Sequence, residues 1–135
     1  MKALAKLKQE LQELEAMESL NTVIQRGSIA MIELPQILGS IQNGLRPCII
    51  ISNNRANKFS PNLTVIPLTS RTKKPMPTHH TIEPTNKNGL RTTSTALGEQ
   101  ILTVSKQCIR KVIGTLDEIH VESINNILRA SIDLF

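Results

Sequence analysis

The sequence predicts one mainly β (α+β) domain, in which short strands form a small barrel or sandwich and a helix lies at each end of the chain. Two patterns indicate this class: short apolar runs separated by Gly, Pro and Asn turns after about residue 26, and helical periodicity at both ends. A length of 135 residues suits a single folded domain. We therefore expect an amphipathic helical extension over residues 1–24 and a barrel domain over residues 25–135.

The first element is a helix over residues 2–20. Its leucines recur at three-four-three spacing, with Lys, Glu and Gln between them, at Leu4, Leu7, Leu11 and Leu14. Glu18 then breaks the apolar seam, so the pattern lasts for about two heptads, which is too short for an independent coiled coil. We expect this helix to dock on its own domain, on a second copy or on a partner.

Strand-length apolar runs follow the helix. They occupy residues 29–34, 48–51, 63–69, 78–83 and 95–104. A loop with two glycines, residues 36–45, separates the first two runs. Pro67 interrupts the third run and predicts an edge strand or a bulge, which would re-aim Thr69.

The last element is a second helix. Thr115 and Glu118 have the spacing of a capping box, in which the two side chains satisfy backbone amides at a helix start. Its expected apolar face consists of Val121, Ile124, Leu128 and Ile132.

Positive charge is concentrated in the middle of the chain. The net charge is +5, but residues 46–111 contain 11 basic and 2 acidic residues, a local excess of +9. Such a body suits a polyanionic partner, either a nucleic acid or an acidic protein segment, although a solvated basic surface is the plainer alternative. The sequence contains no Trp or Tyr and only two Phe, so almost no aromatic side chain is present on which a nucleobase could stack. RNA would have to be bound by charge and hydrogen bonds.

The two cysteines and the first ten residues indicate in which compartment the protein works. Cys48 and Cys108 are far apart and have no metal-ligand spacing, so we expect two reduced thiols and no zinc site. Residues 1–10 contain lysines and glutamine among the leucines, and no apolar run is long enough for a signal or a membrane span. We expect a soluble, cytoplasmic protein.

Several short motifs follow one another along the chain in a specific order. They are Arg26-Gly27, Gly39-Ser40-x-Gln42-x-Gly44-x-Arg46-Pro47, Ile51-Ser52-Asn53, Asn57-Lys58-Phe59-Ser60-Pro61, Pro67-Leu68-Thr69-Ser70, Pro77-Thr78-His79, Glu99-Gln100-Ile101 and Ile113-Gly114-Thr115-Leu116. In this order the chain resembles the MazF/PemK-type toxins, ribosome-independent endoribonucleases of toxin–antitoxin pairs. The resemblance runs from about residue 26 to residue 135.

The resemblance implies an SH3-like β-barrel with a C-terminal helix, assembled as a homodimer. It implies sequence-selective cleavage of single-stranded RNA without a metal or other cofactor. It also implies a cognate antitoxin whose acidic tail fills the RNA groove, association with DNA only through that antitoxin, and no membrane partner.

Two positions would perform the chemistry. Arg46 matches the family's catalytic arginine, and a guanidinium can hold two phosphate oxygens while charge builds on the phosphorus. Thr69 matches the second catalytic position; its hydroxyl is a poor base, so we assign it to orienting the 2′-hydroxyl or the phosphate. The implied products are 2′,3′-cyclic phosphate and 5′-hydroxyl ends. The expected RNA-binding residues are Ser40, Gln42, Asn43, Ser70, Arg71, Lys73, Lys74 and Gln100.

The plainer interpretations stay open at this stage. Arg46 could be a surface charge at a strand start, and the Glu99-Gln100 pair could hold loops instead of touching a base. Neighbouring strand residues point to opposite faces, so His79 and His80 cannot form one imidazole pair, and a two-histidine ribonuclease is disfavoured. His79 is expected to be structural and His120 exposed.

The sequence also departs from its relatives. Ile41 stands where many carry glutamate, and positions 28 and 102 lack an acid and an arginine that often occur there. Two other functions therefore remain: a non-enzymatic barrel toxin that inhibits a protein such as gyrase, and a catalytically weak homologue that binds an antitoxin or regulates its own operon.

Overall fold

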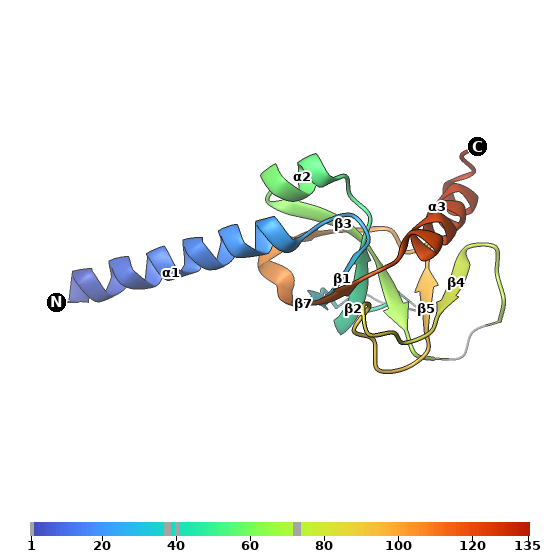
Figure 1. Ribbon diagram of the computed structural model, residues 1–135, viewed down its shortest axis with the longest axis horizontal. Coiled ribbons are helices and arrows are strands. Elements are labelled where there is room, and N and C mark those ends of the chain that lie inside the picture. The colour runs from blue at the N-terminus through green and yellow to red at the C-terminus, as the bar shows by residue number, and fades with distance from the viewer. Residues whose placement is uncertain (1, 37–38, 40, 72–73) are drawn as a thin grey trace.

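The computed structural model describes residues 2–36, 39, 41–71 and 74–135, with the side chains of residues 15–23 left aside. The helices are α1 (Lys2–Val23), α2 (Asn54–Phe59) and α3 (Glu118–Ile132), with a 3₁₀ turn, η1, at Lys106–Cys108. The strands are β1 (Ser28–Leu34), β2 (Gly44–Ile50), β3 (Asn62–Thr69), β4 (His79–Ile82), β5 (Ser94–Leu97), β6 (Leu102–Ser105) and β7 (Ile109–Thr115). Figure 1 shows α1 extending away from the body of strands, while α3 lies against it. The fold is therefore mixed α+β, as expected.

The seven strands form one antiparallel sheet in the order β4-β5-β3-β2-β1-β7, with β6 also pairing with β3. β3 is its centre, because it pairs with β2 on one side and, on the other, with β6 over residues 62–65 and with β5 over residues 68–69. Pro67 thus lies in an interior strand, and the expectation of an edge is wrong. It falls between the β6 and β5 ladders, where a missing N–H breaks no ladder bond.

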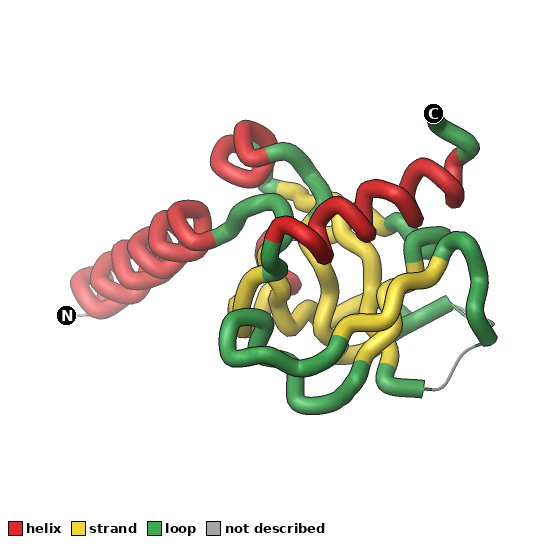
Figure 2. Tube along the Cα trace, turned by 45° about the vertical axis from the view of Figure 1, so that its right-hand side comes forward, coloured by secondary structure: helices red, strands yellow, loops and turns green. Residues whose placement is uncertain are grey.

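Two hydrophobic cores lie on opposite faces of the strands. The first is built mainly from β1, β2, β3 and β6 and includes Ile32, Cys48 and Val65. The second joins the other face of β1, β2, β3 and β5 to α3, through residues such as Leu68 and Ile124. Because side chains alternate along a strand, β1, β2 and β3 each contribute residues to both cores. Figure 2 shows α3 lying along one side of the strands.

The cap of α3 differs from the predicted one. Asp117 is the N-cap residue, and its carboxylate accepts a hydrogen bond from the His120 N–H at 3.1 Å. Thr115 instead ends β7, so the predicted capping box starts two residues too early. The buried face also shifts, because Ile127 is buried while Ile132 is 58 % exposed.

α1 does not dock along its leucine stripe. Leu4, Leu7, Leu11 and Leu14 are each more than half exposed. Of the three expected docking places, its own domain is therefore wrong for residues 2–14. Within the part of the chain that the structure describes, no helix has the length and apolarity to cross a membrane.

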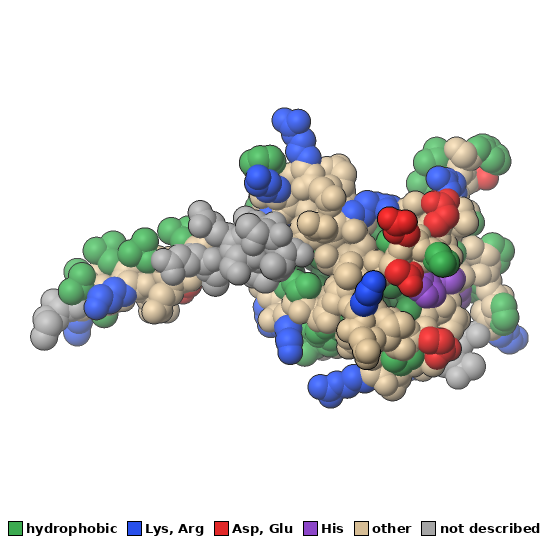
Figure 3. Space-filling view, viewed as in Figure 1, with side chains coloured by type: hydrophobic (Ala, Val, Ile, Leu, Met, Phe, Trp, Pro, Cys, Tyr) green, Lys and Arg blue, Asp and Glu red, His purple; other side chains and the backbone are tan. Residues whose placement is uncertain are grey.

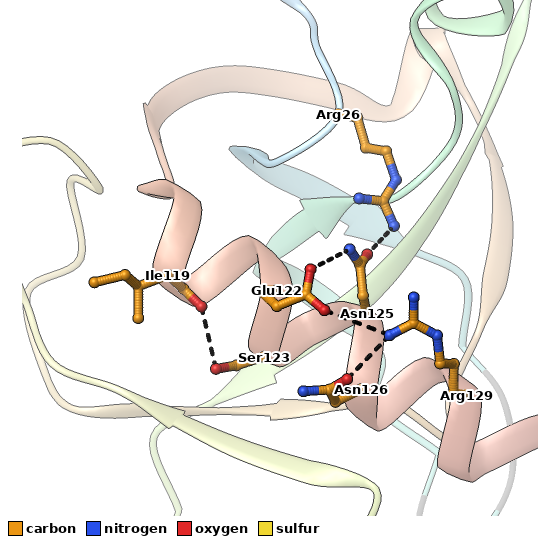
Figure 4. A network of polar contacts seen from close by, with 7 residues as sticks. All are labelled: Arg26, Ile119, Glu122, Ser123, Asn125, Asn126 and Arg129. Carbon is orange, nitrogen blue, oxygen red and sulfur yellow. Dashed lines mark hydrogen bonds and ion pairs between the residues drawn. The ribbon is translucent and has the colours of Figure 1, made fainter. Parts of the chain in front are cut away.

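Arg26 ties the helices to the strands. Its backbone N–H donates to Asn54 Oδ1 at 2.7 Å, and its Nε donates to the Ile51 carbonyl at 3.0 Å. Its Nη2 donates to Asn125 Oδ1 of α3 at 2.6 Å, as Figure 4 shows. The Arg26-Gly27 motif therefore has a structural explanation, since one guanidinium joins the residue that follows β2 to α3.

Candidate functional site

Arg46 is held at the start of β2 by its own turn. Gly44 adopts φ +74°, a conformation that few other residues take, and the chain doubles back so that Arg46 Nε donates to the Asn43 carbonyl at 2.7 Å. Among the described residues, neither terminal guanidinium nitrogen of Arg46 has a hydrogen-bonding partner. The turn thus fixes the side chain through Nε and leaves the terminal nitrogens available for an anion.

Arg46 and Thr69 lie just beyond the same end of the β2–β3 ladder. That ladder ends at the Cys48–Pro67 pair, and Arg46 and Thr69 each lie two residues past it on their own strands, so both are on the same face as that pair. The Thr69 hydroxyl oxygen accepts the Arg71 N–H at 3.2 Å, so its proton remains to be donated. Thr69 is only 2 % exposed, and a substrate reaches it only if neighbouring side chains yield.

Gln42 and Gln100 join two loops. The Gln42 N–H donates to Gln100 Oε1 at 2.9 Å, and Gln42 is 8 % exposed. The structure therefore gives Gln100 the loop-holding contact that was the alternative to base recognition, and Asn43 holds Arg46 through its carbonyl.

Ser70, the residue that follows β3, lines a groove that also includes Arg46. The groove has a volume of about 530 Å³, and its lining includes Arg46, Ser70, Arg91 and Lys111 around an apolar floor. No acidic side chain is among its lining residues. Arg91 and Lys111 had no sequence motif; the Asn88-Gly89 turn and the pairing of β7 with β1 bring them here.

A second, smaller pocket lies at the far end of β4 and β5. Its volume is about 140 Å³, and its walls include Lys74, His79, Thr81 and Thr95. His79 Nε2 lies 2.9 Å from Glu99 Oε1. This contact matches the loop-holding alternative for the Glu99-Gln100 pair.

His80 and His120 form a pair that the sequence did not reveal. His80 Nε2 lies 2.9 Å from His120 Nδ1, so one ring donates to the other and β4 is joined to α3. Burial, and then the proximity of His120, hold the pKa of His80 below its usual range. His120 is half-buried, and the expectation that it is exposed is wrong. Figure 3 shows histidine side chains among acidic ones near α3.

The remaining predicted positions are scattered. Arg71 and Lys74 are exposed, while Ser40 and Lys73 lie outside the described residues. Within the described ranges, no group of three or more His, Cys, Asp or Glu side chains is arranged to hold a metal ion. Cys48 and Cys108 are both free thiols, as predicted.

Comparison with known proteins gives one consistent family. The family described as PemK-like, MazF-like toxin of type II toxin-antitoxin system matches residues 25–132. "Endoribonuclease EndoA" of Bacillus subtilis is 33 % identical over 113 residues, covering 83 % of this chain and 97 % of that protein. "Endoribonuclease MazF" of Staphylococcus saprophyticus is 34 % identical over 113 residues, covering 83 % and 93 %.

Solved structures agree on the fold. A MazF crystal structure from Deinococcus radiodurans superposes with a TM-score of 0.70 at 19 % identity, covering 82 % of this chain and 97 % of that one. A mycobacterial endoribonuclease in complex with its cognate antitoxin gives a TM-score of 0.68 at 24 % identity, covering 84 % and 98 %. The chain therefore belongs to the PemK-like, MazF-like toxins of type II toxin–antitoxin systems.

Proposed function

We propose that this protein is a sequence-selective endoribonuclease that cleaves single-stranded RNA without a metal ion. The observation that carries the proposal is the placement of Arg46 and Thr69 just beyond the same end of the β2–β3 ladder, with the Arg46 Nε already held by the Asn43 carbonyl. Two relatives at 33 % and 34 % identity are named endoribonucleases, which supports the same activity here.

In this proposal Arg46 neutralises the phosphate. The two terminal nitrogens of its guanidinium donate hydrogen bonds to two phosphate oxygens. They stabilise the negative charge that grows as phosphorus becomes five-coordinate. Thr69 acts as a donor, because its oxygen is already occupied by the Arg71 N–H. The Thr69 hydroxyl keeps its proton and donates a hydrogen bond to a phosphate oxygen. The 2′-oxygen attacks phosphorus in line as the bond to the 5′-oxygen breaks, and the 2′-hydroxyl proton passes by way of a phosphate oxygen or solvent to the leaving 5′-oxygen. The products are a 2′,3′-cyclic phosphate and a 5′-hydroxyl end.

Cationic side chains on both faces of β3 would hold the flanking chain. Arg71 and Lys74 extend from the strand end beyond Thr69, and Arg91 and Lys111 line the groove beside Ser70. Such contacts to phosphates position RNA and make binding weaker at high salt. Ser40 and Lys73, which lie outside the described residues, stay predicted RNA contacts.

We further propose a homodimer with an SH3-like barrel in each protomer. Ile41, Leu45 and Ile101 are 40–52 % exposed beside the Gln42–Gln100 link, an apolar surface that a second copy would cover. The expected mass in light scattering is twice the 15.0 kDa of one chain. The partner would be an acidic antitoxin that competes with RNA and supplies any DNA contact; one structural relative was crystallised with its cognate antitoxin.

The test is cleavage of a long, poorly structured RNA in excess chelator, followed by mapping of the new 5′ ends. We expect discrete cuts with 5′-hydroxyl ends, absent in Arg46→Ala and reduced by roughly 100-fold or more in Arg46→Lys, which keeps the charge but loses the fork. Arg55→Ala, which removes an exposed arginine of α2, is the matched control and should cut normally. Failure of the folded wild-type dimer to cut would refute the proposal and favour an inhibitor of a protein target.

A further inference from the structure

A row of polar side chains crosses the sheet face that lies opposite the second core. Thr95 of β5 is the direct cross-strand partner of both Thr69 and Thr81, so the three threonines share one face. His79 precedes Thr81 by two residues and therefore lies on the same face. The alternate residues of these strands enter the second core beneath α3. The row thus leads from the proposed reaction site to His79.

The row ends in the pocket of about 140 Å³ described above. Thr81 and Thr95 belong to its walls, and Lys74 adds an exposed cation at its rim. The pocket is comparable in size to a single nucleobase. Hydroxyl groups, an imidazole and a cation are the groups that recognise base edges and phosphates in single-stranded RNA.

Glu99 determines which nitrogen of His79 carries a proton. Burial raises the pKa of Glu99, but the hydrogen bonds from His79, the Glu99 backbone and Thr78, together with the charge of His79, outweigh it, and the pKa lies below its usual range. An ionised carboxylate can only accept, so Nε2 must donate across the 2.9 Å contact. With that proton on Nε2, the Nδ1 of a neutral imidazole is an acceptor with a lone pair.

Nδ1 of His79 is the ring nitrogen that does not contact Glu99. The His79 side chain is 8 % exposed, and Nδ1 has no hydrogen-bonding partner among the described residues. A buried acceptor without a partner indicates a group that is supplied from elsewhere. Since Nδ1 is closed off from solvent, a ligand reaches it only when the exposed segment 74–76, which lines the same pocket, moves aside.

The distance to Thr69 excludes His79 as the base of the reaction. Two steps between strands and two residues along β4 place the Cα atoms of His79 and Thr69 about 12 Å apart. That separation is too long for both side chains to act on one phosphate, but it suits a neighbouring nucleotide.

We propose that this pocket is a specificity subsite for one nucleobase beside the cleaved bond, which donates an N–H to His79 Nδ1. The inference rests on the proposed ribonuclease function. Glu99 is a positioning residue that keeps the acceptor facing the base, and Lys74 holds the phosphate of the same nucleotide.

The test compares His79→Phe with His80→Phe. The first variant removes both ring nitrogens from the pocket, and the second makes the same change on the opposite face of β4. Each protein is assayed with RNA oligonucleotides that vary one base at a time around the mapped cut, and with analogues lacking the attacking 2′-hydroxyl for binding by fluorescence anisotropy.

We expect the wild type and His80→Phe to prefer a base with an N–H donor at one position. His79→Phe should lose about 3- to 10-fold of that preference, the effect of one neutral hydrogen bond, while preferences elsewhere stay unchanged. Glu99→Ala should lose part of it, and this variant serves if His79→Phe does not fold. Nitrogen NMR of His79 should show a proton on Nε2 and none on Nδ1.

The outcomes separate the two proposals. An unchanged base preference in His79→Phe, an equal weakening for all sequences, or a proton on Nδ1 would overturn the subsite. Base-selective binding that is lost in His79→Phe, but without cleavage by the wild type, would support the subsite and refute the ribonuclease proposal. Cleavage by the wild type with no base preference that depends on His79 would support the ribonuclease proposal and refute the subsite. A wild type that neither binds nor cuts RNA would overturn both.

Discussion

Asn88 holds the turn that leads into the basic groove, and replacing it with alanine should destabilise the whole domain. The Asn88 side chain is 2 % exposed, and its Oδ1 accepts the N–H groups of Thr85 and Leu90, both at 3.0 Å. Its Nδ2 donates to the Glu83 carbonyl at 2.9 Å. Three hydrogen bonds at about 0.5–1.5 kcal/mol each predict a loss of about 1.5–4.5 kcal/mol in the free energy of unfolding.

The assay is urea unfolding at a fixed protein concentration, supported by thermal melting. With about 2.1 cal/mol/K of unfolding entropy per residue, this loss corresponds to a decrease of about 5–16 °C in Tm. Asn86→Ala changes an exposed asparagine of the same turn and should stay within about 0.5 kcal/mol of the wild type. A similarly small effect of Asn88→Ala would refute the reasoning that these three bonds hold the turn.

Three further perturbations test other parts of the structure. A methyl group in Gly114→Ala would collide with the Lys87 carbonyl oxygen, so we expect urea unfolding to show a loss of about 1–3 kcal/mol in the free energy of unfolding. An unchanged free energy would contradict the close approach of the turn at Lys87 to β7. The folded state keeps His80 from protonation while the unfolded chain accepts a proton near pH 6.5, so stability should fall from about pH 7 to pH 5. His80→Gln should flatten that decrease, and an unchanged profile would show that other groups cause it. Burial raises the pKa of Cys48 to about 12, so iodoacetamide at pH 8 should modify Cys108 well before Cys48, as mass spectrometry of peptides can show.

The sequence predicted those elements whose pattern is regular. The helix at residues 2–20, the apolar runs of β1 and β3, and the final helix all have clear periodicity, and each is present in the structure. β7 was missed. Its pairing with β1 contains two register shifts, and such irregularities break the alternation by which a strand is recognised.

The sequence indicates candidate site residues only where the signal is local. Arg46 and Thr69 stay predictions, each of which rests on a recognisable motif near a strand end. Lys111 of the groove and the His80–His120 contact come from segments that are far apart in the chain, so only the folded sheet brings them to their partners. His79 was predicted to be merely structural, since nothing in the sequence shows that Glu99 leaves its other nitrogen unpaired.

The pairing of β1 with β7 has a consequence for how a cell makes this protein. β1 is among the first strands to leave the ribosome, yet its neighbour in the sheet spans residues 109–115, and α3 completes the second core later still. Arg46 and Thr69 are therefore synthesised long before the framework that aligns them exists. We expect a nascent chain to be inert until β7 and α3 have left the ribosome, so that activity against RNA begins only after the codons for residues 109–132 have been translated.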